Sequence, residues 1–215
     1  MNINNEFASA RLTAGQLNAI VKKMGGYEKA LAFLSGKITV SEPIRSWREQ
    51  DGVIYFTVVS NRKTGQEWMD YFTSKGNRIS IRAKQLLLSD DFKNTITNKV
   101  VTEMAVLKGM LFNDGDRTID NIRAEARKRN WSAPNAEDAC LIRDMFTDED
   151  LKTMGLFWLI TMHKPIEDSG GGPGLLSANR DGDGGWLRAY CDEPGHRFYR
   201  GGGFAFTVSQ VVLES

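Results

Sequence analysis

The C-terminal stretch FAFTVSQVVL constrains the fold of this chain more than any other segment. Phe204, Phe206 and Val208 recur at every second position, which places them on one face of an extended strand. A strand with one apolar face is stable only when that face packs against another layer of the protein. We therefore expect this segment to lie inside a sheet and to hold the residues that precede it in place.

Strand and helix patterns alternate along the rest of the chain. β-branched and aromatic residues predict strands at 52–60, 100–112, 156–163 and 186–190. Apolar residues at helical spacing and capping residues predict helices at 13–24, 27–36, 64–76, 80–89, 116–130, 132–146 and 147–155. This mixture indicates an α+β protein. Polar residues 89–99 read as a linker, so we expect a helical or mixed N-terminal segment at 1–97 and a second domain at 98–215.

The overall composition excludes several classes of protein. With 215 residues, 41% of them hydrophobic, the chain can build a packed core and is not of the disordered class. A formal net charge of +1 gives no general attraction to nucleic acid or to an anionic membrane. No apolar run approaches the roughly 18 residues of a membrane span, and no secretory signal is visible. We expect a cytoplasmic protein; display on a cell or virion surface by another route is left open.

Metal and disulfide signals are weak. Cys140 and Cys191 are too few for a disulfide framework or a cysteine-based zinc site, and two free thiols are favoured over a single bridge. The run NRDGDG at 179–184 imitates the start of a calcium loop, but Tyr190 occupies the position that requires a bidentate glutamate. We therefore expect neither a metal nor a cofactor.

Two alternatives to a binding function come from the same residues. His163, Asp168, Asp181 and His196 would form an acid–base or metal set if the fold brought them together, which would indicate a hydrolytic or metal-dependent enzyme using His163, Asp168 and His196. No catalytic spacing supports this set, and His163 at the end of an apolar strand is more typical of a structural histidine. The two helices at 13–36, joined by two glycines, would alternatively suit a DNA-binding regulator.

The segment Ser177–Gly203 has an unusual composition. Of its 27 residues, 21 are Asn, Asp, His, Tyr, Ser, Gly, Cys, Arg or Phe, and lysine is absent after Lys164 although arginine remains abundant. Trp186, Leu187 and Ala189 are among the few exceptions and read as fixed scaffold positions. Arginine and tyrosine supply large contact areas on binding surfaces, while Ser, Gly and Asn adapt to the partner.

Three family resemblances follow from these stretches. IDNIRAEARKRNWSAPNAEDACLIRD, with Pro134 and Glu137, resembles the two-helix signature of C-type-lectin-like domains of the formylglycine-generating-enzyme type. Combined with the 177–203 composition, it resembles the variable proteins of diversity-generating retroelements, in which mutagenesis of AAY codons yields this residue set. The whole chain is also similar to a set of uncharacterised bacterial proteins that share LTAGQLNAIVKK and GFAF-VSQV. The resemblance implies a C-type-lectin-like domain, two helices plus a small antiparallel sheet, over about 98–215.

The resemblance and the residue pattern together predict a non-enzymatic, diversified binding surface. In WLRAY we expect Leu187 and Ala189 to face the core and Arg188 and Tyr190 to face a partner. That partner is expected to be a protein, because the aspartates of the segment would repel phosphate; the oligomeric state is left open. The predicted ligand-binding residues are Asn179, Arg180, Asp181, Asp183, Trp186, Arg188, Tyr190, Asp192, His196, Arg197, Tyr199 and Arg200.

Overall fold

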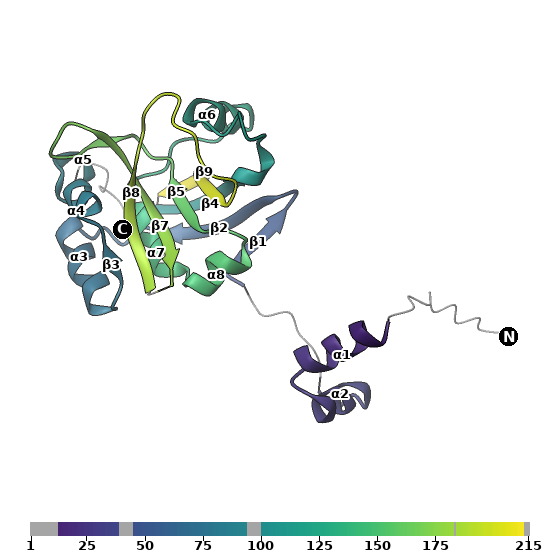
Figure 1. Ribbon diagram of the computed structural model, residues 1–215. Coiled ribbons are helices and arrows are strands. Elements are labelled where there is room, and N and C mark those ends of the chain that lie inside the picture. Colours follow the sequence, from purple (N-terminus) through teal and green to yellow (C-terminus); the bar gives the residue numbers. More distant parts are fainter. Residues whose placement is uncertain (1–12, 39–44, 94–99, 183, 213–215) are drawn as a thin grey trace. The chain divides into compact units, whose positions relative to one another are not determined.

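A computed structural model describes residues 13–38, 45–93, 100–182 and 184–212 (Figure 1). The chain divides into two compact units, Met1–Arg45 and Ser46–Ser215. The boundary expected between residues 97 and 98 needs correction, because the segments on both sides of it pair within one sheet. Strand β2 (Val53–Val59) forms an antiparallel ladder with β4 (Val100–Lys108), with Val53 opposite Leu107.

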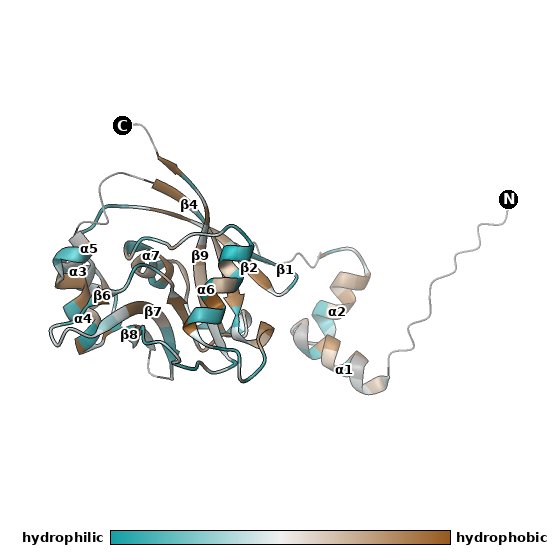
Figure 2. Ribbon diagram, turned by 90° about the horizontal axis from the view of Figure 1, so that it is seen from above, coloured by the Kyte–Doolittle hydropathy of each residue, from teal (hydrophilic) through white to brown (hydrophobic). Residues whose placement is uncertain are grey.

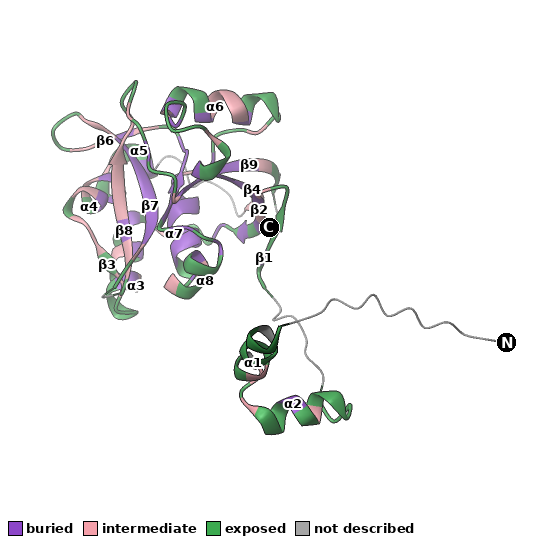
Figure 3. Ribbon diagram, turned by 45° about the vertical axis from the view of Figure 1, so that its right-hand side comes forward, coloured by how far each residue is buried: buried purple, intermediate pink, exposed green. Residues whose placement is uncertain are grey.

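The first unit contains the two helices predicted from the sequence. Helix α1 spans Ala14–Lys23 and α2 spans Tyr27–Leu34. Gly25 and Gly26 between them have φ angles of 88° and 107°, a backbone conformation that glycine adopts without steric cost. Both helices are mostly exposed, and Ala30 is the one buried residue of α2 (Figure 3).

The second unit is built on one mixed sheet, so the α+β class is confirmed. Its strands follow the order β1-β2-β4-β9-β5-β7-β8-β3, and β6 pairs with β7. β5 runs parallel to β9 and β3 parallel to β8, so the sheet is larger and less purely antiparallel than expected. The remaining strands are β1 (Trp47–Gln50), β3 (Arg78–Ile79), β5 (Trp158–Thr161), β6 (Ile166–Glu167), β7 (Pro173–Asp181), β8 (Gly184–Cys191) and β9 (Gly202–Val212).

The helices of this unit begin largely at the predicted capping residues. Thr64 and Thr147 each accept a backbone N–H three residues on, in reciprocal capping boxes with Glu67 and Asp150. Asparagine is a common N-cap residue, but Asn135 does not cap the helix Glu137–Met145. The N-cap position is occupied by Ala136, which makes no side-chain cap hydrogen bond, and the backbone N–H of Asn135 donates to the Asp138 carboxylate. The helices are α3 (Gly65–Ser74), α4 (Ile81–Leu88), α5 (Asp90–Lys93), α6 (Ile119–Lys128), α7 (Glu137–Met145), α8 (Asp148–Thr153) and the 3₁₀ turn η1 (Gly109–Leu111).

The sheet separates two hydrophobic clusters. Cluster 1 contains buried side chains of α3, α4 and α7, and cluster 2 contains those of α6. Apolar residues follow β4 and β9 through the middle of the unit (Figure 2). Phe204 and Phe206 lie in cluster 2, whereas Ala205 between them lies in cluster 1, so the predicted period-two alternation of the last strand is confirmed.

The sequence pattern did not predict strand β7. It begins at Pro173 and ends at Asp181, residue types that usually mark turns. Its middle residues are nevertheless buried, because β5 and β8 flank it on both sides. Burial from both neighbours outweighs the local turn propensity.

Candidate functional site

Most of the unusual polar segment forms an antiparallel hairpin of β7 and β8 within the sheet. Ser177 lies opposite Arg188, and Asn179 lies opposite Trp186. Because side chains alternate along a strand, Trp186, Arg188 and Tyr190 share the face of Asn179 and Asp181. We call this face of the hairpin, together with residues 192–201, the hairpin face.

The alternation predicted for WLRAY is present in the structure. Leu187 is fully buried in cluster 1, and Ala189 packs against the same cluster. Arg188 and Tyr190 lie on the opposite face of the strand, where Tyr190 packs against cluster 2. The core side of β8 is thus apolar and tightly packed, while its other side carries the large polar residues.

Trp186 lies between two arginines at the edge of the hairpin face. The guanidinium of Arg188 is 4.7 Å from the Trp186 ring centroid, and that of Arg78 is 5.4 Å from it. Arg188 also forms an ion pair with Asp181 across the hairpin. Cation–π contact and ion pairing hold these long side chains in place, which lowers the entropy that binding would cost. Arg78 belongs to β3, and no motif in the sequence identifies it as part of this surface.

Tyr190 and Asn179, both predicted to bind a partner, are more buried than residues of an exposed contact surface. The amide of Asn179, only 6% exposed, donates to the Tyr190 hydroxyl at 3.0 Å and accepts from Ser177 Oγ at 2.7 Å. The Tyr190 ring lies 5.4 Å from that of Trp158, and burial raises the pKa of its phenol. Asn179 therefore lies beneath the surface and holds the Tyr190 hydroxyl in place.

Asp192 is part of the internal structure instead of the exposed surface. Its carboxylate accepts two hydrogen bonds from Arg123 of α6, at 2.9 and 2.8 Å, and its side chain is 4% exposed. The sequence could not reveal this, because the cation that pairs with Asp192 lies 69 residues away.

Residues 193–201 form a loop beside the hairpin, and buried contacts of Phe198 fix its position. Phe198 is buried among Trp158, Tyr190 and Phe204, and the His196 ring makes an edge-to-face contact with it, with the ring centroids 4.7 Å apart. Arg117 donates to the Phe198 carbonyl at 3.0 Å. These anchors leave Arg197, Tyr199 and Arg200 exposed, with Tyr199 82% accessible.

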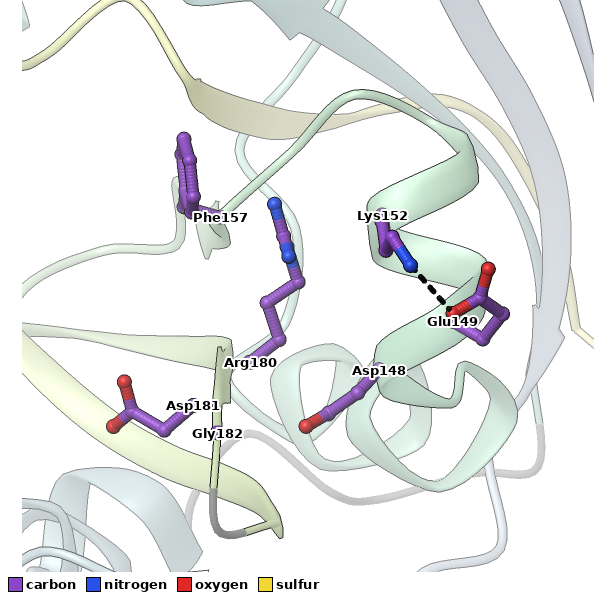
Figure 4. A pocket seen from close by; sticks show the side chains of 7 residues that line it. All are labelled: Asp148, Glu149, Lys152, Phe157, Arg180, Asp181 and Gly182. Carbon is purple, nitrogen blue, oxygen red and sulfur yellow. Dashed lines mark hydrogen bonds and ion pairs between the residues drawn. The ribbon is translucent and has the colours of Figure 1, made fainter.

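Arg180 points toward α8, away from Trp186 and Arg188. It lines a pocket of about 320 Å³ whose other lining residues are Asp148, Glu149, Lys152, Phe157, Asp181 and Gly182 (Figure 4). Its guanidinium lies 4.4 Å from the Phe157 ring centroid, and its Nε donates to the Leu156 carbonyl at 2.6 Å. Asp183, the neighbouring predicted residue, lies outside the described residues.

The residues of the alternative catalytic set are engaged by separate elements. His163 is buried: its Nε2 accepts the N–H of Leu176, so Nδ1 carries the proton and donates to the Lys164 carbonyl. Burial lowers the pKa of His163 to about 4. Asp168 accepts the N–H groups of Gly170 and Gly172, which lower its pKa, and pairs with Arg82.

Three further observations bear on the chemistry. No group of three His, Cys, Asp or Glu side chains within the described residues is arranged to hold a metal ion. Both Cys140 and Cys191 are free thiols. None of the described helices is long and apolar enough to cross a membrane.

No protein-family model, curated protein or solved structure matches this chain.

Proposed function

We propose that this protein is a non-enzymatic binding protein that uses the hairpin face to recognise another protein. The observation that carries the proposal is the alternation of β8: Leu187 is fully buried, while Arg188 on the next position stands on the other face beside Trp186. A segment rich in Gly, Asp and Arg is thereby held by a packed sheet, with Trp186 and Arg188 partly exposed and Tyr199 exposed, while Tyr190 and Phe198 pack against cluster 2. A rigid surface of this kind binds with little loss of conformational entropy.

A C-type-lectin-like domain of the retroelement-diversified type is the family proposed for the second unit, Ser46–Ser215. Support comes from the two helices α6 and α7, which lie between β4 and β5 along the chain. Further support comes from the last strand, β9, which pairs with β4. Residues before 98 extend this sheet through β1 and β2.

The chemistry of the hairpin face favours a protein partner. Trp186 and Tyr199 offer accessible aromatic area, and Arg188 and Arg197 offer hydrogen-bond donors beside it. Aromatic and arginine residues carry most of the binding energy in protein interfaces. Asp181, paired with Arg188, places negative charge where a nucleic-acid phosphate would have to approach.

Natural variation tests the diversification. If the gene is a retroelement target, isolates will differ at AAY codons within 177–203, and a near-copy template will lie beside a reverse-transcriptase gene. Leu187, Ala189 and Phe204 will stay unchanged, since each packs in the core. Differences spread evenly over the chain, with no template, would refute the diversification.

Site-specific cross-linking tests the binding surface. A photoreactive amino acid replaces Tyr199 in one protein and Lys84, an exposed residue of α4, in the control. In the native host we expect one defined cross-linked partner from position 199 that is absent from position 84, and that disappears when Arg188 is also replaced by alanine. Equal products at both positions would contradict the proposed surface.

A further inference from the structure

We infer that the Arg180 pocket binds a carboxylate side chain of the partner protein. This inference rests on the proposed function and extends it, because it assigns one chemical group of the partner to one site on this chain. The pocket borders the hairpin face: Asp181 lines the pocket and also pairs with Arg188. Asp181 is therefore the residue at which a partner on Arg188 and Trp186 comes next to the pocket, whereas the Arg180 side chain itself lies on the other face of β7.

The first argument concerns charge. Each carboxylate that lines the pocket already has a cationic partner: Asp148 pairs with Arg143 at 3.1 Å, Glu149 with Lys152 at 3.3 Å, and Asp181 with Arg188. Arg180 differs from these cations, since no described residue accepts a hydrogen bond from its Nη1 or Nη2. The pocket thus contains a guanidinium whose two Nη groups are hydrogen-bonded to no described carboxylate, although three carboxylates that are paired with other cations line the same pocket.

The second argument concerns orientation. Nε of Arg180 is held by the Leu156 carbonyl, its backbone N–H donates to the Phe157 carbonyl at 3.0 Å, and its guanidinium packs against the Phe157 ring. Figure 4 shows the guanidinium in the middle of the lining residues, with the end of Lys152 on its other side. Two nitrogens of a fixed, planar guanidinium match the two oxygens of a carboxylate.

The third argument concerns which anion fits. Asp148, Glu149 and Asp181 surround the guanidinium, so an incoming dianion such as phosphate meets more repulsion than a single carboxylate does. The exposed ring of Phe157, 59% accessible, can cover the methylene groups of an aspartate or glutamate side chain. The Glu149–Lys152 pair is exposed and weak, which leaves Lys152 able to turn toward a bound carboxylate.

A titration without any partner tests the pocket. The full chain is followed by amide NMR spectra in about 150 mM salt while N-acetyl-glutamate α-amide is added; the neutral glutamine analogue and inorganic phosphate are added in parallel. We expect saturable shifts at Lys152, Phe157 and Gly182 with a Kd on the order of millimolar. The glutamine analogue is expected to bind at least about tenfold more weakly, since it lacks the charge.

Matched variants make the result specific. Arg180→Gln should weaken binding of the glutamate probe at least about tenfold, whereas Arg127→Gln, at an exposed arginine of α6 outside both the pocket and the hairpin face, should leave the affinity for the probe unchanged. Equal binding of the glutamine analogue, tighter binding of phosphate, or unchanged affinity in R180Q would overturn the inference. Should R180Q fail to fold, the position of the shifts in the unmodified chain decides. These outcomes leave the cross-linking test unaffected, so failure of the pocket and failure of the hairpin face are distinguishable.

Discussion

Arg123 and Asp192 form a two-pronged ion pair that joins helix α6 to the end of strand β8. Nη1 and Nη2 of Arg123 donate to the carboxylate, one to each oxygen, at 2.9 and 2.8 Å. Asp192 is nearly inaccessible, and its backbone N–H donates to the Pro173 carbonyl of β7. The pair therefore fixes the end of strand β8, after which the exposed loop 193–201 begins.

Removing this pair should destabilise the protein. We expect Asp192→Ala to lower the free energy of unfolding by about 2 kcal/mol, because it leaves a largely buried guanidinium without its anion. Glu125→Ala, which breaks more exposed pairs with Lys128 and Arg129 at the C-terminal end of the same helix, is the matched control and should cost less than about 0.5 kcal/mol. Urea unfolding measures both; equal losses would show that Asp192 is an ordinary surface residue.

Neighbouring substitutions in β8 should separate stability from binding. Leu187→Ala is expected to cost about 2–5 kcal/mol, since it opens a cavity in cluster 1. Arg188→Ala should cost less than about 1 kcal/mol, because its side chain is 41% exposed, yet it should abolish the cross-link from position 199. Thermal unfolding and the cross-linking assay report the two effects, and a large loss of stability in R188A would count against its assignment to the surface.

Asp138 and His163 should give opposite pH dependences of stability. Burial raises the Asp138 pKa to about 7, so the folded state binds a proton that the unfolded chain releases, and stability falls as the pH rises from about 4 to 7. Burial lowers the His163 pKa to about 4, so its contribution is complete above pH 6.5 and is lost as the pH falls toward 4.

Asp138→Asn isolates the first effect. The stability of the variant relative to the unmodified protein should rise with pH between 4 and 7, by on the order of 1 kcal/mol per pH unit. Urea unfolding at pH 4.5, 5.5 and 6.5 measures the difference. A difference that does not change with pH would mean that Asp138 titrates normally in the folded state.

The second unit should fold without the first. Every residue of clusters 1 and 2 lies at position 47 or later, so a fragment of residues 46–215 retains both cores. We expect its melting temperature to lie within about 3 °C of that of the full chain, a shift that corresponds to less than about 1 kcal/mol. Calorimetry of the two proteins checks this, and loss of the cooperative transition in the fragment would contradict it.

Local patterns predicted the elements well where the pattern was long and unambiguous. Helices α3 and α8 follow directly from the capping residues Thr64 and Thr147. The linker expected at 89–99 was instead partly helical, as α5, and Phe92 within it is fully buried. The burial of Phe92 could not be predicted from this polar stretch, because a single apolar residue gives no periodic pattern.

The candidate site was predictable only in part, for a similar reason. Trp186, Arg188 and Tyr199 lie on the surface expected for them. Asn179 and Asp192 do not, since Tyr190 and Arg123 engage them in the interior. Arg78 and Phe157 contact the predicted residues but carry no signal of their own in the sequence.

The amino-acid sequence by itself determined which side chains of each strand share a face, because that alternation depends only on the local backbone. It therefore placed Leu187 against the core and Arg188 on the opposite face, and it placed Phe204 and Phe206 on the same face of the last strand. Only the tertiary structure decided which distant elements meet these faces. Arg123 reaches Asp192 and Phe157 reaches Arg180 through strand pairings and helix packing that are set by the whole core, and no local pattern encodes them.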